Sequence, residues 1–223
     1  MDKLFFTEEH EMLKKMVQDF AENEVEPLAR EMDKKETIPK DLIDKMGKLG
    51  IMGIPVPEKY GGAGMDTVAY ATAIMELAKV DASVAITVAA HTSLGTMPIV
   101  LAGSEEQKMK YVPDLASGKV LGAFGLTEPE AGSDAGATKT TAVKNGDEYI
   151  VNGSKIFITN SGISGYLNLT AQIIEDGELV GVGAFITETN NPGLIISPKE
   201  KKMGWRASDT CLLYTSPSPR DRG

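Results

Sequence analysis

The sequence predicts an α+β protein of two domains, in which a helical half precedes a β half. The first half of the 223 residues carries apolar side chains at helical spacing, and the second half carries short apolar runs separated by turn residues. The character of the sequence changes near Gly118. Helices and strands are segregated rather than alternating, so a sheet built from alternating strands and helices is not favoured.

Several helices are expected before Gly118. Thr7 is the expected N-cap of the first helix, with Phe6 before it as a hydrophobic staple. A second helix is expected to begin near Pro39 and to end at Gly50. Its buried residues are expected to be Leu42, Ile43, Met46 and Leu49. Three further helices are expected over about 66–80, 82–100 and 104–116.

The longest mainly apolar segment is 84–102. Its polar residues indicate whether it is a membrane span or a buried helix. It is interrupted by Thr87, His91, Thr92, Ser93 and Pro98. We therefore expect a buried helix pair or a broken helix, not a membrane span.

The β half is expected to form a small antiparallel barrel or sandwich. Asn145-Gly146-Asp147 has the composition of a hairpin turn between two strand segments. Residues 155–159 give a further strand signal, and two more strands are expected over 167–174 and 179–187. The expected boundaries are therefore a helical domain over 1–117, a β domain over 118–210 and an aberrant tail over 211–223.

The composition excludes some partners. The formal net charge of −9 and the pI near 4.9 argue against nucleic-acid binding and against docking on anionic membranes, because both require a basic surface. The single cysteine, Cys211, rules out a disulfide within the chain, and the N-terminus lacks the pattern of a secretory signal. A cytoplasmic location is expected.

His10 and His91 lie far apart without an organised set of partners, so packing or hydrogen bonding is favoured for His91 over catalysis.

Two glycine-rich stretches are candidate ligand loops. Gly61-Gly62-Ala63-Gly64 lacks the spacing of a dinucleotide-binding loop, so we favour an interhelical connection. Residues 125–136 combine small and hydroxyl side chains between two β segments. Such a segment fits either a backbone that approaches a flat ligand closely or an ordinary turn-rich connection.

Several motifs resemble the acyl-CoA dehydrogenase family, in particular its short-chain, butyryl-CoA dehydrogenase-like members. Leu126-Thr127-Glu128 with Gly132-Ser133-Asp134 matches the family signature, and Phe157-Ile158-Thr159-Asn160 resembles its second flavin segment. Residues 56–62, 93–98 and 202–210 also look like family sequence, so the resemblance runs in order over about residues 3 to 210.

The resemblance implies a flavoprotein that binds FAD where its helical and β domains meet. The implied FAD-binding residues are Phe124, Leu126, Thr127, Gly132, Ser133, Phe157, Ile158 and Thr159. Ser133 is also implied to contact the acyl-CoA substrate. The family oxidises an acyl-CoA to its trans-2-enoyl-CoA, passes the electrons to an electron-transferring flavoprotein and is usually homotetrameric.

No catalytic residue is implied within this chain. The family's base is a carboxylate of a C-terminal helical bundle domain, so the sequence is expected to be a truncated fragment that is inactive alone. Glu128 and Asp134 are expected to order their loop instead. After Cys211 the sequence departs from the family, and Leu212 to Gly223, with its Ser-Pro repeats and closing charges, reads as a foreign ending. Two alternatives stay open: an acyl-CoA oxidase or monooxygenase of the same fold, and a non-catalytic module that binds flavin or acyl-CoA.

Overall fold

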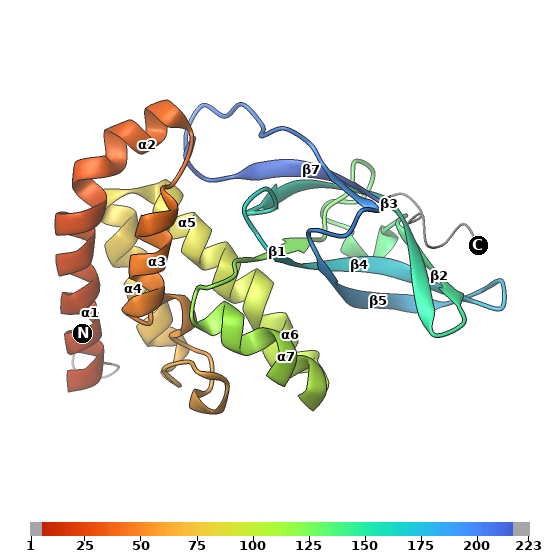
Figure 1. Cartoon of the computed structure of the whole chain (residues 1–223), viewed down its shortest axis with the longest axis horizontal. Coiled ribbons are helices and arrows are strands. Elements are labelled where there is room, and N and C mark those ends of the chain that lie inside the picture. Colours follow the sequence, from red (N-terminus) through yellow and green to blue (C-terminus); the bar gives the residue numbers. More distant parts are fainter. Residues whose placement is uncertain (1–5, 216–223) are drawn as a thin grey trace. The chain divides into compact units, whose positions relative to one another are not determined.

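The computed structural model describes residues 6–215 and divides the chain into two compact units. The helical unit comprises residues up to Leu121 together with Lys201–Asp209, and the β unit comprises Gly122–Glu200 with the chain from Thr210 onward. The α+β class is confirmed (Figure 1). Residues 201–209, expected in the β domain, group with the helical unit.

The helical unit contains seven α-helices among the described residues. They are α1 (Glu8–Phe20), α2 (Ala29–Lys35), α3 (Lys40–Lys48), α4 (Thr67–Val80), α5 (Ala82–Ala90), α6 (Met97–Ala102) and α7 (Glu105–Ala116). Side-chain caps fix several of the starts: Thr7, Asp66 and Ser104 each accept a backbone N–H at the beginning of α1, α4 and α7. The short helix α2 was not expected from the sequence.

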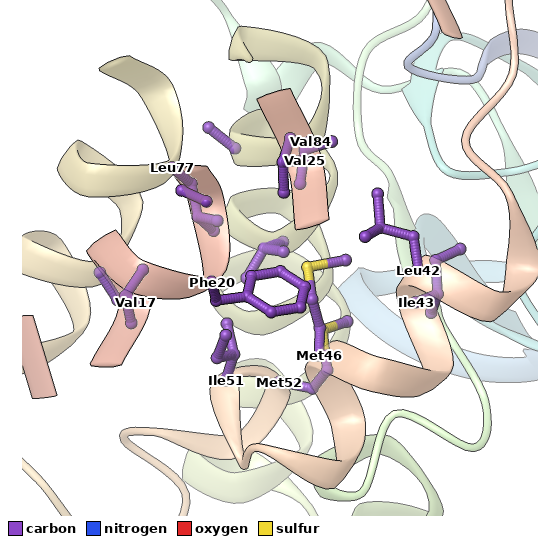
Figure 2. Close-up of a cluster of buried hydrophobic side chains, with 14 of the residues drawn as sticks. Val17, Phe20, Val25, Leu42, Ile43, Met46, Ile51, Met52, Leu77 and Val84 are labelled. Carbon is purple, nitrogen blue, oxygen red and sulfur yellow. The ribbon is translucent and has the colours of Figure 1, made fainter. Parts of the chain in front are cut away.

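One core holds the helical unit together. Figure 2 shows Phe20 and Met46 among buried aliphatic side chains from α1, α3, α4 and α5. The second helix was expected to bury four residues, but Leu49 is 42% exposed. Leu49 is the C-cap residue of α3, immediately before the left-handed Gly50. The chain leaves the helix at this point, so the Leu49 side chain does not lie on the buried face.

Residues 82–102 form one continuous helical segment rather than a helix pair. Its middle, His91–Thr96, is wound more loosely as a π-helix, immediately before Pro98. Proline cannot donate a backbone hydrogen bond, and π-helical turns are a common way to absorb such an interruption. By length and composition the segment could cross a membrane, but 56% of its apolar window is buried inside the structure, which supports a core helix.

The β unit contains a seven-stranded sheet among the described residues. The strands are β1 (Gly122–Gly125), β2 (Thr141–Asn145), β3 (Glu148–Thr159), β4 (Tyr166–Glu175), β5 (Glu178–Glu188), β6 (Leu194–Ile196) and β7 (Thr210–Thr215). The hairpin expected at Asn145-Gly146-Asp147 is confirmed, and the strands expected over 167–174 and 179–187 pair antiparallel across a turn at Asp176-Gly177. Gly146 and Gly177 both adopt positive φ. The segment 155–159, expected as a separate strand, is the second half of β3.

The sheet is mixed: among the described residues four strand pairings are antiparallel, as expected, and two are parallel, which was not expected. Strand β4 is paired along one edge with β5, antiparallel, and along the other with β1 and then β2, both parallel. Strand β1 meets the first half of β4 at Tyr166–Leu169, and β2 meets its second half at Gln172–Ile174. Partners so distant in sequence carry no local signal of their direction.

Strand β7 corrects the expected tail. It pairs antiparallel with both β3 and β6, so residues 211–215 complete the sheet instead of beginning a foreign ending. Leu213 and Cys211 are buried in it. The predicted aberrant character of 216–223 lies outside the described residues.

Candidate functional site

The signature loop leaves β1 and turns back on itself at once. Glu128 and Ala131 exchange backbone hydrogen bonds of 2.9 and 3.2 Å, which close a tight turn after Thr127. The small and polar residues 132–136 that follow are exposed. The loop therefore has a fixed base and an open, small-residue tip.

The predicted flavin residues of this loop lie on its accessible side. Phe124 and Thr127 are half-buried, and Leu126, Gly132 and Ser133 are exposed. A Cβ atom built on Gly132 would meet nothing within 4 Å among the described residues. Packing within the chain therefore does not require glycine there, and the space is free for a ligand.

The second predicted segment contains a β-bulge in β3. The register between β3 and β7 shifts between Lys155 and Ile158, and Phe157 adopts a left-handed φ of 59°. A regular strand would point Lys155 and Phe157 to the same side and Ile158 to the other. The bulge instead turns both Lys155 and Ile158 into the interior and leaves Phe157 65% exposed.

Left-handed backbone is unfavourable for an aromatic residue, and such strain gathers at functional sites. A ring that is 65% exposed on a strained backbone contributes little packing to the β unit. Ile158 lies in the core of the β unit, so only its backbone could face a ligand, and Thr159 is half-buried beside it. The exposure of Phe157 is the observation that most favours a ligand at this position.

The structure brings the two predicted segments together. The Ile156 amide donates to the Thr127 carbonyl at 2.8 Å, so the bulged part of β3 and the signature loop share a backbone hydrogen bond. All eight predicted flavin-binding residues belong to the β unit.

A buried ion pair lies behind this surface. The Lys155 ammonium and a Glu128 carboxylate oxygen are 2.7 Å apart, and the two residues are 1% and 4% exposed. Glu128 also accepts hydrogen bonds from the Thr138 hydroxyl and from the amides of Lys139 and Thr140. The predicted loop-ordering role of Glu128 is thereby confirmed.

The charges of the pair are set by opposing effects. Burial raises the pKa of Glu128, but the hydrogen bonds from Lys155, Thr138 and Thr140 outweigh it and bring this pKa to about 2. Burial lowers the pKa of Lys155, and Glu128 opposes that change. A carboxyl group so strongly held in its ionised form is a poor proton acceptor, so Glu128 does not suit the role of a catalytic base.

Lys155 and Thr138 are the residues that sequence reasoning missed. The usable signal was a lysine inside the apolar run Lys155–Thr159, together with an acidic residue in the signature that needed a partner. Buried lysines almost always have a partner, so the two observations together could have indicated the pair.

A groove of about 450 Å³ is also present in the β unit. It is lined by Glu128, Pro129, Glu130, Lys139, Thr140, Gly153, Ser154 and Tyr214. None of the eight predicted flavin-binding residues is among the residues that line this groove.

The glycine-rich stretch at 61–64 in the helical unit is a structural turn. The four amides of residues 61–64 all donate to backbone carbonyls of residues 53–58, at 2.8–3.3 Å. Amides already used in this way cannot cradle a phosphate. Gly61 and Gly64 adopt positive φ, and a Cβ on Gly62 would lie 2.1 Å from the Val56 carbonyl oxygen. The preferred interpretation as an interhelical connection is confirmed.

Both histidines have structural roles. His91 is fully buried, and its Nε2 lies 3.1 Å from the Leu115 carbonyl oxygen, to which it donates. Burial lowers the pKa of His91 to about 4, against an opposing effect of the hydrogen bond to Leu115. His10 accepts the Thr7 amide through Nδ1 at 3.1 Å and meets Asp66 through Nε2 at 2.9 Å, so it joins the caps of α1 and α4.

Sequence profiles of known families match nearly the whole chain. The profile described as "Acyl-CoA dehydrogenase, N-terminal domain" matches residues 7–119. The profile described as "Acyl-CoA dehydrogenase, middle domain" matches residues 123–216. The second match ends beyond the Cys211 at which the sequence suggested a foreign tail.

Individual relatives agree with these profiles. An acyl-CoA dehydrogenase of Bacillus subtilis is 52% identical over 207 residues, which cover 93% of this chain and 55% of the relative. The structure of butyryl-CoA dehydrogenase from Megasphaera elsdenii matches 98% of this chain and 58% of its own, with a TM-score of 0.90 and 42% identity. An acyl-CoA dehydrogenase from Bacillus anthracis, complexed with FAD, matches 98% of this chain and 38% of its own, with a TM-score of 0.88 and 41% identity. The chain spans about half the length of the curated relatives it matches.

Proposed function

Because this chain belongs to the acyl-CoA dehydrogenase family, we propose that it provides the helical and middle domains of a flavin-dependent acyl-CoA dehydrogenase. The reaction is the oxidation of an acyl-CoA thioester to its trans-2-enoyl-CoA. Relatives named for butyryl-CoA or short-chain substrates support a short acyl chain.

The residues present fit an FAD cofactor. Phe157 offers an exposed aromatic face on a strained backbone, and the space at Gly132 lets a flat group approach the signature loop. The Thr127 and Thr159 hydroxyls lie in the two segments that the Ile156–Thr127 hydrogen bond joins. The exposed, strained Phe157 is the observation that carries the proposal.

These residues would hold FAD as two adjoining walls. Phe124, Leu126 and Thr127 form the wall of the signature loop, and Phe157, Ile158 and Thr159 form the wall of the bulge. Bound there, FAD supplies the hydride acceptor of the reaction. The Thr127 and Thr159 hydroxyls orient the ring, and the exposed Ser133 hydroxyl is positioned to meet the acyl-CoA.

The base that removes the α-proton is proposed to lie outside the described residues of the β unit. Glu128 is fixed as an ionised partner of Lys155. Asp134 is exposed to water, whereas a catalytic base for this proton requires a desolvated, positioned carboxylate. We propose that a C-terminal helical domain supplies it, as in the family.

We also propose an electron acceptor, an oligomeric state and a cellular location for the complete enzyme. The physiological electron acceptor is an electron-transferring flavoprotein, the complete enzyme is a homotetramer, and the protein acts in the cytoplasm. The net charge of −9 and the single, buried Cys211 support a partner other than nucleic acid and a reducing compartment.

The test is an anaerobic titration of the FAD-loaded chain with butyryl-CoA, followed by absorbance. A shift of the flavin band on addition of butyryl-CoA is expected, because Ser133 and the flavin wall lie in the same loop. Loss of the band would show turnover and would contradict the assignment of the base outside the described β unit. A loaded chain whose spectrum ignores butyryl-CoA at millimolar concentration would contradict acyl-CoA binding. In a separate sample whose flavin is first reduced with dithionite, rapid reoxidation by oxygen would indicate an oxidase or monooxygenase instead.

A further inference from the structure

The ion pair between Lys155 and Glu128 is costly for a fold of this kind. Removing two charges from water costs several kcal/mol each, and replacing a buried pair with apolar side chains of similar size often leaves stability unchanged or improved. A gain in stability is therefore not a sufficient explanation for the pair. Its position directly behind the predicted flavin surface suggests one.

The Lys155 ammonium contacts four oxygens. They are the Glu128 carboxylate at 2.7 Å, the Thr138 hydroxyl at 3.0 Å, the Leu126 carbonyl at 3.1 Å and the Thr170 hydroxyl at 3.1 Å. An ammonium group has three protons to donate, so all of them are used. The group is therefore held in one place by partners from β4 and from both sides of the signature turn.

Two of these contacts act directly on the loop that carries Thr127. Lys155 binds the Leu126 carbonyl on one side of Thr127 and the Glu128 carboxylate on the other. The next residue in β3, Ile156, donates its amide to the Thr127 carbonyl itself. Residues 126–128 are thus fastened to the bulged strand at three consecutive positions.

The sequence makes room for this arrangement at Gly125. A Cβ on Gly125 would lie 3.2 Å from Cγ of Lys155 and 3.4 Å from its Cβ. The glycine in β1 therefore lets the lysine stem pass beneath the start of the loop. The bulge at Phe157 is needed as well as the space at Gly125, because it allows Lys155 to point inward while Phe157 points outward.

We propose that Lys155 and Glu128 are positioning residues that lock the signature loop onto the bulged strand, so that both walls of the flavin site are set before the flavin binds. This inference rests on the proposed function for the identity of the ligand. Neither side chain is assigned a contact with FAD, and the pair acts only through Leu126, Thr127 and Phe157.

The test uses a neutral double variant of the full chain, Lys155→Met with Glu128→Gln. Either substitution alone would leave a buried charge unpaired and could prevent folding, whereas the double variant keeps the volume and removes both charges. The control is Leu167→Ala, which removes buried side-chain volume from the core of the β unit without touching the network. All proteins are compared at a temperature well below their unfolding midpoints.

Two quantities are measured on each protein. Hydrogen exchange of the Ile156 amide reports the hydrogen bond to Thr127 without any flavin. The dissociation constant for FAD, from quenching of flavin fluorescence, reports the site itself. We expect the double variant to exchange the Ile156 amide at least about tenfold faster and to bind FAD about 10- to 100-fold more weakly, the range seen when the groups supporting a site are removed. Leu167→Ala is expected to change both by less than about threefold at this temperature.

The outcomes separate this inference from the proposed function. Exchange and FAD affinity that stay at wild-type values in the double variant, or that change equally in Leu167→Ala, would overturn the positioning role. A wild-type chain that binds no FAD would overturn the proposed function. In that case the exchange of Ile156 still decides whether the pair locks the loop.

Discussion

Burial of His91 makes the stability of the helical unit depend on pH. The pKa of this side chain falls from 6.5 to about 4 in the fold, because a fully buried imidazole loses the hydration that its charged form needs. Between these values the unfolded chain binds a proton that the folded chain does not. The contribution of neutral His91 to the free energy of unfolding is therefore fully present above about pH 6.5. It is lost as the pH falls towards 4. At about 1.4 kcal/mol per pKa unit, the full loss is about 3 kcal/mol.

The assay is urea unfolding of the chain at a series of pH values from 7.5 to 4, beside the variant His91→Gln. Glutamine can still donate to the Leu115 carbonyl but does not titrate. Trp205 is the single tryptophan and belongs to the helical unit, so its fluorescence reports this unit alone. The wild-type free energy of unfolding should fall by about 3 kcal/mol more than that of the variant over this range. Parallel curves for the two proteins would show that protonation of His91 does not account for the loss of stability at low pH.

Three further predictions concern the β unit and the glycine turn. Phe157→Gly relieves a left-handed backbone, so the free energy of unfolding of the β unit should drop by no more than about 1 kcal/mol, as measured by chemical denaturation. Loss of stacking should weaken FAD binding about 3- to 10-fold, as measured by flavin titration. Gly62→Ala places a Cβ against the Val56 carbonyl and should destabilise the helical unit by about 3 kcal/mol, and an unchanged thermal midpoint would contradict this. The pKa of Glu128 falls from 4.5 to about 2, so its contribution to stability is present above pH 4.5 and is lost as the pH falls towards 2. Acid unfolding followed by near-ultraviolet circular dichroism should show this loss in the wild type and not in the double variant Lys155→Met with Glu128→Gln, which has neither charge of the pair.

The helical half could be predicted well because its signals are local. Caps such as Thr7 and Ser104 are read from a few neighbouring residues, and the buried positions of α3 follow from helical spacing up to Met46. The prediction failed at Leu49, where the helix was already ending. The apolar spacing continues to Leu49, so it does not show that the helix has already ended at this residue.

The β half could be predicted only for its hairpins. Turns at Gly146 and Gly177 have local signatures, but the parallel pairing of β4 with β1 and β2 depends on residues far apart in the chain. Strand β7 was missed because Thr210–Thr215 lacks a turn that would join it to β3. Strand pairing at such separation has no short-range signal.

The candidate site was predicted by resemblance and not by physical pattern. Strand alternation places Lys155, Phe157 and Thr159 on one face, and the bulge changes this arrangement. A left-handed aromatic residue has no sequence signature, since its strain is tolerated only because the surrounding structure imposes it. The burial of Lys155 beside Glu128 depends on this bulge, so the geometry of the pair is evident only in the structure.

The central claim is that the signature loop and the bulge at Phe157 form a flavin-binding surface. Its most direct test is the absorbance spectrum of the purified chain after incubation with FAD and desalting, with Phe157→Gly treated in parallel. We expect a retained band near ~450 nm in the wild type that is reduced in the variant. A wild-type chain that is folded by circular dichroism and retains no flavin would contradict it.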